Sequence, residues 1–203
     1  MSTVSLTLDE IFDLAKKTLL ANGCDDGTAS ILSDLIRNAE RDGSLSHGLF
    51  RLPAYVSGLK SGKINGKGKP EIKKISSSVI KVQGNNCLAP IVLNKGLPEL
   101  TKAAKENGVA VLAINNSHHM AAMWPETEKL AEEGLVAFAC TSYKPAVAPA
   151  GAIKPLFGTN PISFAWPRPG KRRLFMIWQQ HQWQWVKFKL LKEKGIKFHL
   201  ELV

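Results

Sequence analysis

Apolar residues near the start of the chain recur at the spacing of amphipathic helices. In the first stripe these positions are Leu8, Ile11, Phe12, Ala15 and Leu19. Thr7 followed by Glu10 forms a capping-box pattern just before the stripe, and Gly23 supplies a stop. A second stripe starts at about Asp26 and ends before Gly43. The pattern therefore predicts two successive helices with core-facing apolar sides.

Helical and extended patterns alternate through the rest of the chain. We expect strands over residues 78–82, 109–115, 135–142 and 162–166, the second and third of them buried. We expect helices over residues 52–59, 96–106 and from Pro125 to before Gly134. Strand, helix and strand in alternation predict an α/β protein. The sequence has no GxGxxG motif after a strand, so it does not predict a Rossmann fold.

A stretch rich in Gly, Lys and Pro, residues 61–74, is typical of a connection between subdomains. We therefore place a boundary near residue 70. The expected organisation is a helical subdomain over residues 1–70, an α/β domain over residues 71–170 and a distinct segment over residues 171–203.

The first candidate site follows the second helix. Ser46 and His47 are adjacent, glycines flank them at positions 43 and 48, and Arg51 follows. A histidine exchanges a proton near neutral pH, and a neighbouring hydroxyl can orient it. A guanidinium can bind a carboxylate through two parallel hydrogen bonds. The group predicts a site for an acidic substrate that gains or loses a proton. The alternative is a structural or merely exposed histidine.

A second group of polar residues, residues 116–119, lies where a strand gives way to a helix. It reads Asn-Ser-His-His and ends at His118 and His119. α/β proteins commonly bind ligands at such positions, because a helix start offers free amide donors to an anion. Two adjacent histidines rarely face one metal together, and no carboxylate follows at a ligating spacing. We therefore expect no metal site.

Prolines and glycines alternate over residues 145–161, which indicates a loop of restricted shape. At its end stand Gly158, Thr159, Asn160 and Pro161. The backbone amides and the hydroxyl of such a turn can hold a phosphate or a ribose. The alternative interpretation is a simple linker.

The three cysteines, Cys24, Cys87 and Cys140, are odd in number and form no CxxC pair. The sequence therefore predicts neither a disulfide framework nor a zinc site, and each cysteine is expected to be a small buried hydrophobe. No apolar run reaches the length of about 18 to 20 residues needed to span a bilayer. The N-terminal residues carry acid where a signal peptide needs a basic start. We expect a cytoplasmic protein without membrane association.

The net charge of +10 is concentrated at the C-terminus. Residues 171–203 contain eight Lys or Arg residues against two Glu residues, together with three of the five tryptophans. A basic, aromatic tail suggests an alternative function, a non-enzymatic nucleic-acid-binding module. Without that tail the chain is nearly balanced in charge, so we regard nucleic acid as the less favoured partner.

Three stretches in fixed order resemble one known family. They are DGSLSHGLFRLPAYVSGLKSGKING, INNSHHMAA and APAGAIKPLFGTNPISFAWPRPG. Together they are similar to the malate/L-lactate dehydrogenase family of NAD(P)-dependent oxidoreductases, which is unrelated to the Rossmann-type dehydrogenases. SHGLFR, Tyr55 and FGTNPISFAWPRPG most resemble its Δ1-piperideine-2-carboxylate/Δ1-pyrroline-2-carboxylate reductase branch. The likeness covers about residues 5–171.

The resemblance implies a mixed-sheet, non-Rossmann NAD(P)-binding domain after the helical subdomain, and a homodimer in the intact family. It also implies hydride transfer between NADP or NAD and a small acidic substrate, a 2-oxo acid or a cyclic 2-imino acid. By the same resemblance His47 is the proton donor or acceptor, Ser46 its companion and Arg51 the substrate clamp. His119, Tyr143 and residues 158–161 fall on the cofactor side.

The likeness stops after Gly170. The family continues with a strand that carries an aspartate and with an Ala-Thr-Ser helix, whereas this chain turns basic and aromatic. Codons for residues 175–185, shifted by one base, can spell Tyr-Asp-Leu-Ala-Thr-Thr-Ser-Met-Ala-Met-Gly. We therefore hypothesise that residues 171–203 are a frameshift product and that the chain is a truncated family member. Without the aspartate, we expect little or no catalysis from these 203 residues.

Overall fold

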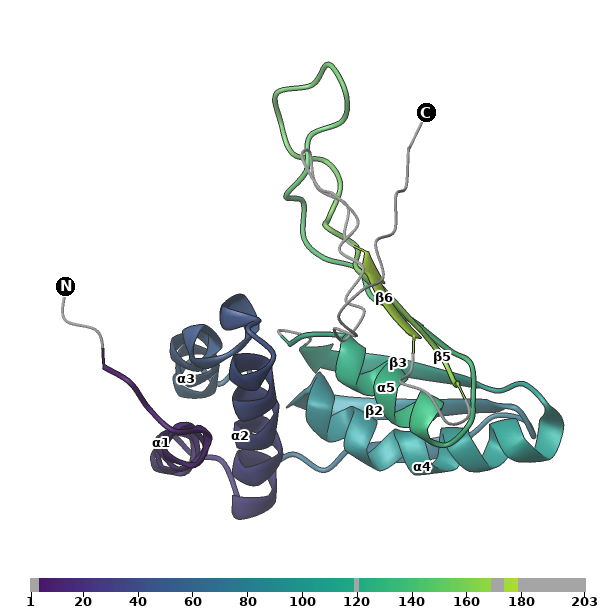
Figure 1. Ribbon diagram of the computed structural model, residues 1–203, viewed down its shortest axis with the longest axis horizontal. Coiled ribbons are helices and arrows are strands. Elements are labelled where there is room, and N and C mark those ends of the chain that lie inside the picture. Colours follow the sequence, from purple (N-terminus) through teal and green to yellow (C-terminus); the bar gives the residue numbers. More distant parts are fainter. Residues whose placement is uncertain (1–3, 119–120, 169–173, 179–203) are drawn as a thin grey trace. The chain divides into compact units, whose positions relative to one another are not determined.

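The computed structural model describes residues 4–118, 121–168 and, for the backbone, 174–178. The chain divides into two compact units, Met1–Ala122 and Met123–Val203 (Figure 1). The first unit contains α1 (Leu8–Ala21), α2 (Asp26–Arg41), the short 3₁₀ helices η1 (Leu45–His47) and η2 (Leu49–Arg51), α3 (Leu52–Lys60), β1 (Glu71–Lys74), β2 (Val79–Leu88), α4 (Ala89–Asn107) and β3 (Val111–His118). The second contains α5 (Trp124–Glu132), β4 (Ala137–Cys140), β5 (Ile162–Trp166) and β6 (Leu174–Trp178). The predicted α/β class is confirmed.

The first two helices begin where the sequence predicts, because side chains satisfy their first amides. The Thr7 hydroxyl accepts a hydrogen bond from the Glu10 amide at 3.2 Å, and the Glu10 carboxylate accepts one from the Thr7 amide at 2.7 Å. The capping box is therefore confirmed. At α2, Asp25 Oδ1 accepts from the Thr28 amide at 2.7 Å.

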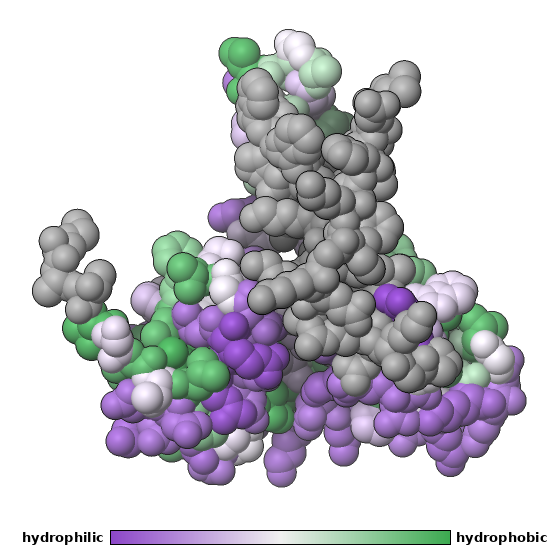
Figure 2. Space-filling model, in the orientation of Figure 1, coloured by the Kyte–Doolittle hydropathy of each residue, from purple (hydrophilic) through white to green (hydrophobic). Residues whose placement is uncertain are grey.

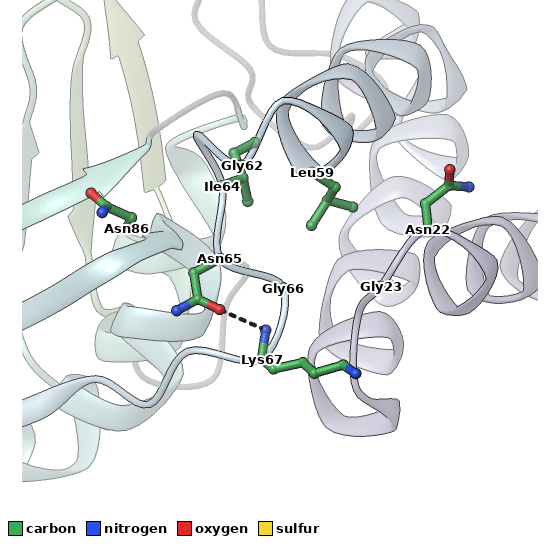
Figure 3. A pocket seen from close by; sticks show the side chains of 9 residues that line it. All are labelled: Asn22, Gly23, Leu59, Gly62, Ile64, Asn65, Gly66, Lys67 and Asn86. Atoms are coloured by element: carbon green, nitrogen blue, oxygen red, sulfur yellow. Dashed lines mark hydrogen bonds between the residues drawn. The ribbon is translucent and has the colours of Figure 1, made fainter.

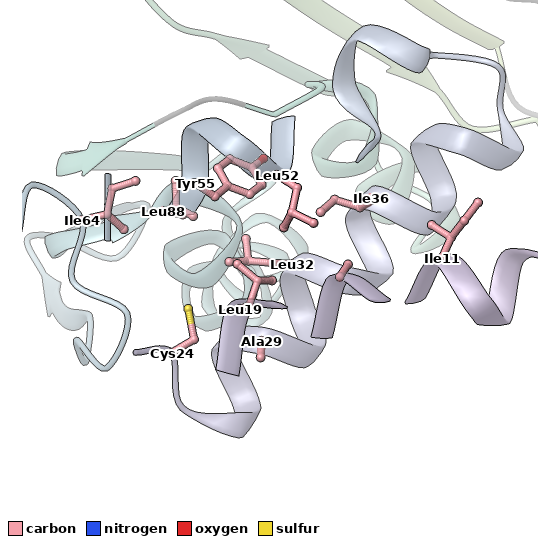
Figure 4. Packing of buried hydrophobic residues seen from close by; sticks show 11 residues of the cluster. Ile11, Leu19, Cys24, Ala29, Leu32, Ile36, Leu52, Tyr55, Ile64 and Leu88 are labelled. Atoms are coloured by element: carbon pink, nitrogen blue, oxygen red, sulfur yellow. The ribbon is translucent and has the colours of Figure 1, made fainter. Parts of the chain in front are cut away.

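The helices of the first unit enclose its main core (Figure 4). The cluster consists of Ile11, Ala15, Leu19, Cys24, Ala29, Leu32, Ile36, Leu52, Tyr55, Ile64 and Leu88. Members from α1, α2 and α3 point toward one another, and Leu88 joins from the end of β2. The core therefore lies directly beneath the segment that carries η1 and η2 into α3.

Beside these helices lies a three-stranded sheet of order β1-β2-β3. β1 pairs antiparallel with β2, and β2 pairs parallel with β3, so the sheet is mixed. β1 was expected to be part of a connection, which is wrong. Its four residues are all exposed, so no apolar pattern marks the strand, and only its pairing with β2 makes it one.

Two predicted elements of this unit are longer than expected. β2 runs to Leu88 rather than ending at Val82, since Asn85 and Asn86 adopt positive φ angles of 48° and 61° and form an irregularity that lets the pairing resume. α4 begins at Ala89 rather than near Gly96. Gly96 lets this helix approach the sheet closely, because a Cβ there would lie 3.0 Å from Leu112.

The outer face of α4 is hydrophilic (Figure 2). Its exposed residues are Asn94, Lys95, Pro98, Glu99, Lys102, Lys105, Glu106 and Asn107. Its inner face packs on the sheet through a second core cluster that includes Ile80, Val82 and Val92. Among the helices within the described ranges, none has the length and apolarity to cross a membrane.

The predicted burial of two strands is wrong. β3 alternates between exposed and half-buried positions, with Val111 55% exposed, because α4 covers one face of the strand. β4 also leaves Phe138 and Cys140 exposed. Cys24 and Cys87 are buried as expected, whereas Cys140 is not.

The second unit contains an antiparallel sheet of order β4-β5-β6 with α5 packed beside it. β5 spans the predicted residues, and α5 begins at Trp124 with Pro125 in its first turn, as predicted. A long excursion between β4 and β5 carries residues 141–161 (Figure 1). The buried hydroxyls of Thr127 and Ser163 lie 2.7 Å apart and tie the helix to the sheet.

Candidate functional site

The turn that carries Ser46 and His47 is built from η1 and η2, two single 3₁₀ turns placed end to end. The His47 amide donates to the Ser44 carbonyl at 2.8 Å, and the Arg51 amide donates to the Gly48 carbonyl at 2.9 Å. The Ser44 amide in turn donates to the Ala39 carbonyl at 2.8 Å, in the last turn of α2. This hydrogen bonding holds the turn against the end of α2.

Two hydroxyls engage one nitrogen of the His47 ring. Ser46 Oγ lies 2.9 Å from His47 Nδ1, and Ser44 Oγ lies 3.5 Å from the same atom. The pairing of Ser46 with His47 was predicted, but the contribution of Ser44 was not. Its signal in the sequence is its position three residues before His47, which one 3₁₀ turn brings to the same side. The hydroxyls restrict the ring's orientation.

Arg51 ends η2 with an unsatisfied donor. Among the described residues, its buried Nε atom has no hydrogen-bond partner and Arg51 forms no ion pair. A buried, unpaired guanidinium nitrogen is costly unless a ligand satisfies it. Tyr55, four residues later and fully buried, is near this charge. Burial raises the pKa of Tyr55 to about 12, and the Arg51 charge opposes part of that rise.

Glu40, a residue that the sequence analysis did not single out, contacts the same turn. Its Oε1 accepts a hydrogen bond from the Leu49 amide at 2.7 Å, across nine residues of sequence. Its signal in the sequence is an acidic residue in the last turn of α2, where the helix dipole disfavours negative charge.

In the second unit, Tyr143 and the Gly158–Pro161 turn come together. The Tyr143 amide donates to Asn160 Oδ1 at 3.1 Å, and the Thr141 amide donates to the Pro161 carbonyl at 3.3 Å. A Cβ on Gly158 would overlap the Tyr143 carbonyl oxygen. Asn160 adopts a positive φ of 38°. These residues thus form one loop cluster, in which Tyr143 is 45% exposed.

The remaining predicted residue, His119, lies outside the described residues. Its neighbour His118 ends β3, opposite Leu88. Ser46, His47 and Arg51 belong to the first unit, and Tyr143 with residues 158–161 belongs to the second. Within the described part of the chain, no group of three or more His, Cys, Asp or Glu side chains is placed to hold a metal.

A pocket of about 370 Å³ lies in the first unit (Figure 3). It is lined by Asn22, Gly23, Leu59, Gly62, Ile64, Asn65, Gly66, Lys67 and Asn86. Asn65 Oδ1 accepts from the Lys67 amide at 3.1 Å and closes one wall. None of the predicted site residues lines it, so the pocket is separate from the chemistry of the Ser46–His47 turn.

Residues 6–177 match the family model described as malate/L-lactate dehydrogenase, and the match extends past Gly170. The chain is 41% identical over 169 residues to Delta(1)-pyrroline-2-carboxylate reductase 1 of Burkholderia ambifaria, covering 83% of this chain and 50% of that protein. It is 40% identical over 168 residues to the Delta(1)-pyrroline-2-carboxylate/Delta(1)-piperideine-2-carboxylate reductase of Pseudomonas syringae pv. tomato, covering 83% and 49%.

Solved structures show the same fold. The crystal structure of delta1-piperideine-2-carboxylate reductase from Pseudomonas syringae pv. tomato matches with a TM-score of 0.81 and 38% identity, covering 87% of this chain and 53% of that chain. Malate dehydrogenase from Pyrococcus horikoshii OT3 matches with a TM-score of 0.80 and 28% identity, covering 86% and 50%. The chain spans about half the length of the curated relatives it matches. With the family model matched over most of its residues, the chain belongs to the malate/L-lactate dehydrogenase family.

Proposed function

We propose that the chain carries the substrate half of an NAD(P)-dependent oxidoreductase that reduces a cyclic 2-imino acid or a 2-oxo acid. The observation that carries the proposal is the buried Nε of Arg51, which has no partner in the described part of the chain and lies on the same turn as the His47 ring and its hydroxyls. A guanidinium whose Nε has no partner among the described residues, together with a proton-exchanging ring, suits a substrate that is both a carboxylate and a proton acceptor. The names of the reductase relatives support this substrate class.

Each residue of the turn has a separate task. Arg51 binds the substrate carboxylate and thereby positions the rest of the substrate, whether a cyclic imine or an open-chain oxo acid. Reduction of an imine adds a hydride to the ring carbon and a proton to the nitrogen, and His47 supplies that proton. The hydroxyls of Ser44 and Ser46 lie within reach of Nδ1 and orient the ring for that transfer. Ser46 holds the ring at the required angle.

A nicotinamide cofactor, NADP or NAD, supplies the hydride when bound. The loop cluster of the second unit has the donor set for such a ligand. It offers a half-exposed aromatic ring at Tyr143, a hydroxyl at Thr159 and an amide at Asn160, held by backbone hydrogen bonds. We assign these residues, with Gly158 and Pro161, to the cofactor side. We also assign His119 to the cofactor side, on the basis of the sequence resemblance alone.

A binding experiment tests the proposal on the chain as it stands. Pyrrole-2-carboxylate, a planar ring with a carboxylate at the position of a cyclic 2-imino acid, is titrated into the labelled protein and followed by NMR. Charge-assisted hydrogen bonds contribute about 1.5 to 3 kcal/mol, so Arg51→Met should weaken binding at least about tenfold. Arg41→Met is the matched control, because Arg41 pairs with Asp42 on the surface of the same region. Equal affinity in the two variants would contradict the proposal.

Whether the chain can catalyse the reaction depends on the origin of residues 171–203. We propose that a frameshift begins within residues 171–203, the first part of which still falls inside the family match. Sequencing the gene through this region and beyond should show that a family-like amino-acid sequence continues in the shifted frame. A protein made in that frame should oxidise NAD(P)H with Δ1-pyrroline-2-carboxylate, whereas the present chain should not. A homodimeric state and a cytoplasmic location stay predictions. Neither the family match nor the relatives support the nucleic-acid-binding alternative.

A further inference from the structure

The helical segment that runs from η2 into α3 begins without a local cap. Gly48 occupies the N-cap position and has no side chain to accept a hydrogen bond from the first amides. The Leu49 amide, the first of the segment, instead donates to the Glu40 carboxylate at 2.7 Å. A carboxylate at a helix start is favourable both as an acceptor and as a charge. Glu40 therefore acts as an N-cap supplied from another helix.

Glu40 occupies a costly position within its own helix. It lies in the last turn of α2, where the carbonyl ends disfavour a negative charge. Its neighbours Ile36 and Ala39 are buried, so the α2 backbone is anchored in the core. A glutamate that is unfavourable within its own helix, on a rigid element, indicates that its role is the contact with the Leu49 amide.

Gly48 fits this contact sterically. A Cβ at position 48 would overlap the Glu40 carboxylate and lie 2.8 Å from its Cγ. Any larger residue must therefore push the carboxylate away from the Leu49 amide. The glycine that follows His47 is thus explained by the approach of Glu40.

The contact lies between the two groups of the proposed chemistry. His47 is the residue before Gly48, and Arg51 closes the 3₁₀ turn that Glu40 caps. We propose that Glu40 is a positioning residue, whose carboxylate fixes the Gly48–Leu49 backbone and thereby the placement of His47 relative to Arg51. This inference deepens the proposed function and rests on it for the roles of His47 and Arg51.

The test compares three variants with the wild-type chain by NMR. Glu40→Ala removes the acceptor, and Gly48→Ala displaces it. Glu40→Gln keeps an acceptor oxygen of the same reach. We expect the first two to move the Leu49 amide resonance upfield and to change the His47 ring nitrogen shifts. Glu40→Gln should restore both signals most of the way. Glu106→Ala, which removes an exposed carboxylate from α4, is the matched control and should change neither.

Binding of pyrrole-2-carboxylate supplies the functional readout. Displacing Arg51 can at most cost its charged hydrogen bond to the ligand, about tenfold, so Glu40→Ala and Gly48→Ala should each weaken binding by up to that factor, with recovery in Glu40→Gln. If the Leu49 amide shifts but the His47 signals do not, Glu40 is only a structural cap and the inference is wrong. If neither the Leu49 amide signal nor the His47 ring signals change in Glu40→Ala and Gly48→Ala, the inference is also wrong.

The outcome separates this inference from the proposed function. If Arg51→Met leaves pyrrole-2-carboxylate affinity unchanged, the proposed function fails, and the His47 signals alone decide the role of Glu40. If Arg51→Met weakens binding while Glu40→Ala and Gly48→Ala do not, the function stands and the positioning role fails. Hydrogen exchange of the α2 amides monitors folding, so an unfolded variant is recognised before its binding is interpreted.

Discussion

The two units hold their candidate residues by different means. In the first unit the Ser46–His47 turn is fastened to a large buried core by Glu40, by the Ser44 backbone and by the fully buried Tyr55. In the second unit the Gly158–Pro161 turn meets Tyr143 through hydrogen bonds and close backbone approach, within a loop whose apolar residues are largely exposed.

The two units are therefore sensitive to substitution at different kinds of position. A site anchored in a packed core depends on side-chain volume far below the surface. A loop held by hydrogen bonds depends on backbone shape at a few positions.

Removing volume from the first core should have the largest effect. Leu32 is fully buried in α2, so Leu32→Ala should lower the free energy of unfolding of the first unit by about 3 kcal/mol. Leu14→Ala, at a position that is 46% exposed on α1, should cost less than about 0.5 kcal/mol. Hydrogen exchange of α2 amides measures both. Similar losses in the two variants would mean that the cluster does not act as a core.

Alkaline pH should destabilise the first unit through Tyr55. Its pKa rises from 10.0 to about 12 because of burial, so the neutral phenol's contribution is fully present below pH 10 and is lost as the pH rises toward 12. One pKa unit corresponds to about 1.4 kcal/mol, so the loss should reach about 2 to 3 kcal/mol.

The control for this pH effect is Tyr55→Phe. Unfolding by urea between pH 9 and 12 should show a steeper loss of stability in the wild type than in the variant. Both proteins keep the thiols of Cys24 and Cys87, whose pKa values burial also raises, so the difference isolates Tyr55. Parallel curves would show that the phenol ionises in the folded protein without cost.

A methyl group on Gly158 should disturb the second unit locally. Because its Cβ would overlap the Tyr143 carbonyl oxygen, Gly158→Ala must separate the two backbones. Overpacking of this kind costs about 1 to 3 kcal/mol. Faster hydrogen exchange at the Tyr143 amide is the expected readout, with exchange in α2 unchanged. Ala150→Ser, at an exposed position of the same loop, is the control and should leave the Tyr143 amide unaffected.

The smallest expected effect is at the edge of the first unit. Thr7→Ala removes the side-chain half of the capping box and should cost about 1 kcal/mol. Thr7→Ser keeps the hydroxyl and should recover most of it. Urea unfolding monitored through the amides of α1 measures the change. A loss above about 2 kcal/mol would contradict this prediction and would mean that the start of α1 contributes to the packing of the core.

Local sequence patterns were sufficient for several elements. The capping box of Thr7 and Glu10, the stripe of α2 and the span of β5 were predicted because neighbouring residues determine them. β1 was missed because it has no apolar face of its own. The burial of β3 was overestimated because an apolar run does not reveal that only one of its faces would be covered.

The candidate site likewise contains residues that the sequence could identify and one residue that it could not. Ser46, His47 and Arg51 could be singled out from the sequence, because proton exchange and carboxylate binding require these side chains and a short glycine-flanked turn keeps them together. Glu40 could not be assigned a role, since its partner Leu49 lies on a different element and the hydrogen bond forms only when the turn folds back on α2.

By itself, the sequence determined α1 and α2, the α/β class and the chemistry available at the Ser46–His47 turn, because each depends on residues within a turn or two of one another. The tertiary structure decided that β1 is a strand, that Asn160 meets the Tyr143 backbone and that Glu40 caps the turn while Arg51 Nε is left without a partner among the described residues. These features depend on groups far apart along the chain. Packing of the core and pairing of the strands bring such groups together, and no local pattern encodes that.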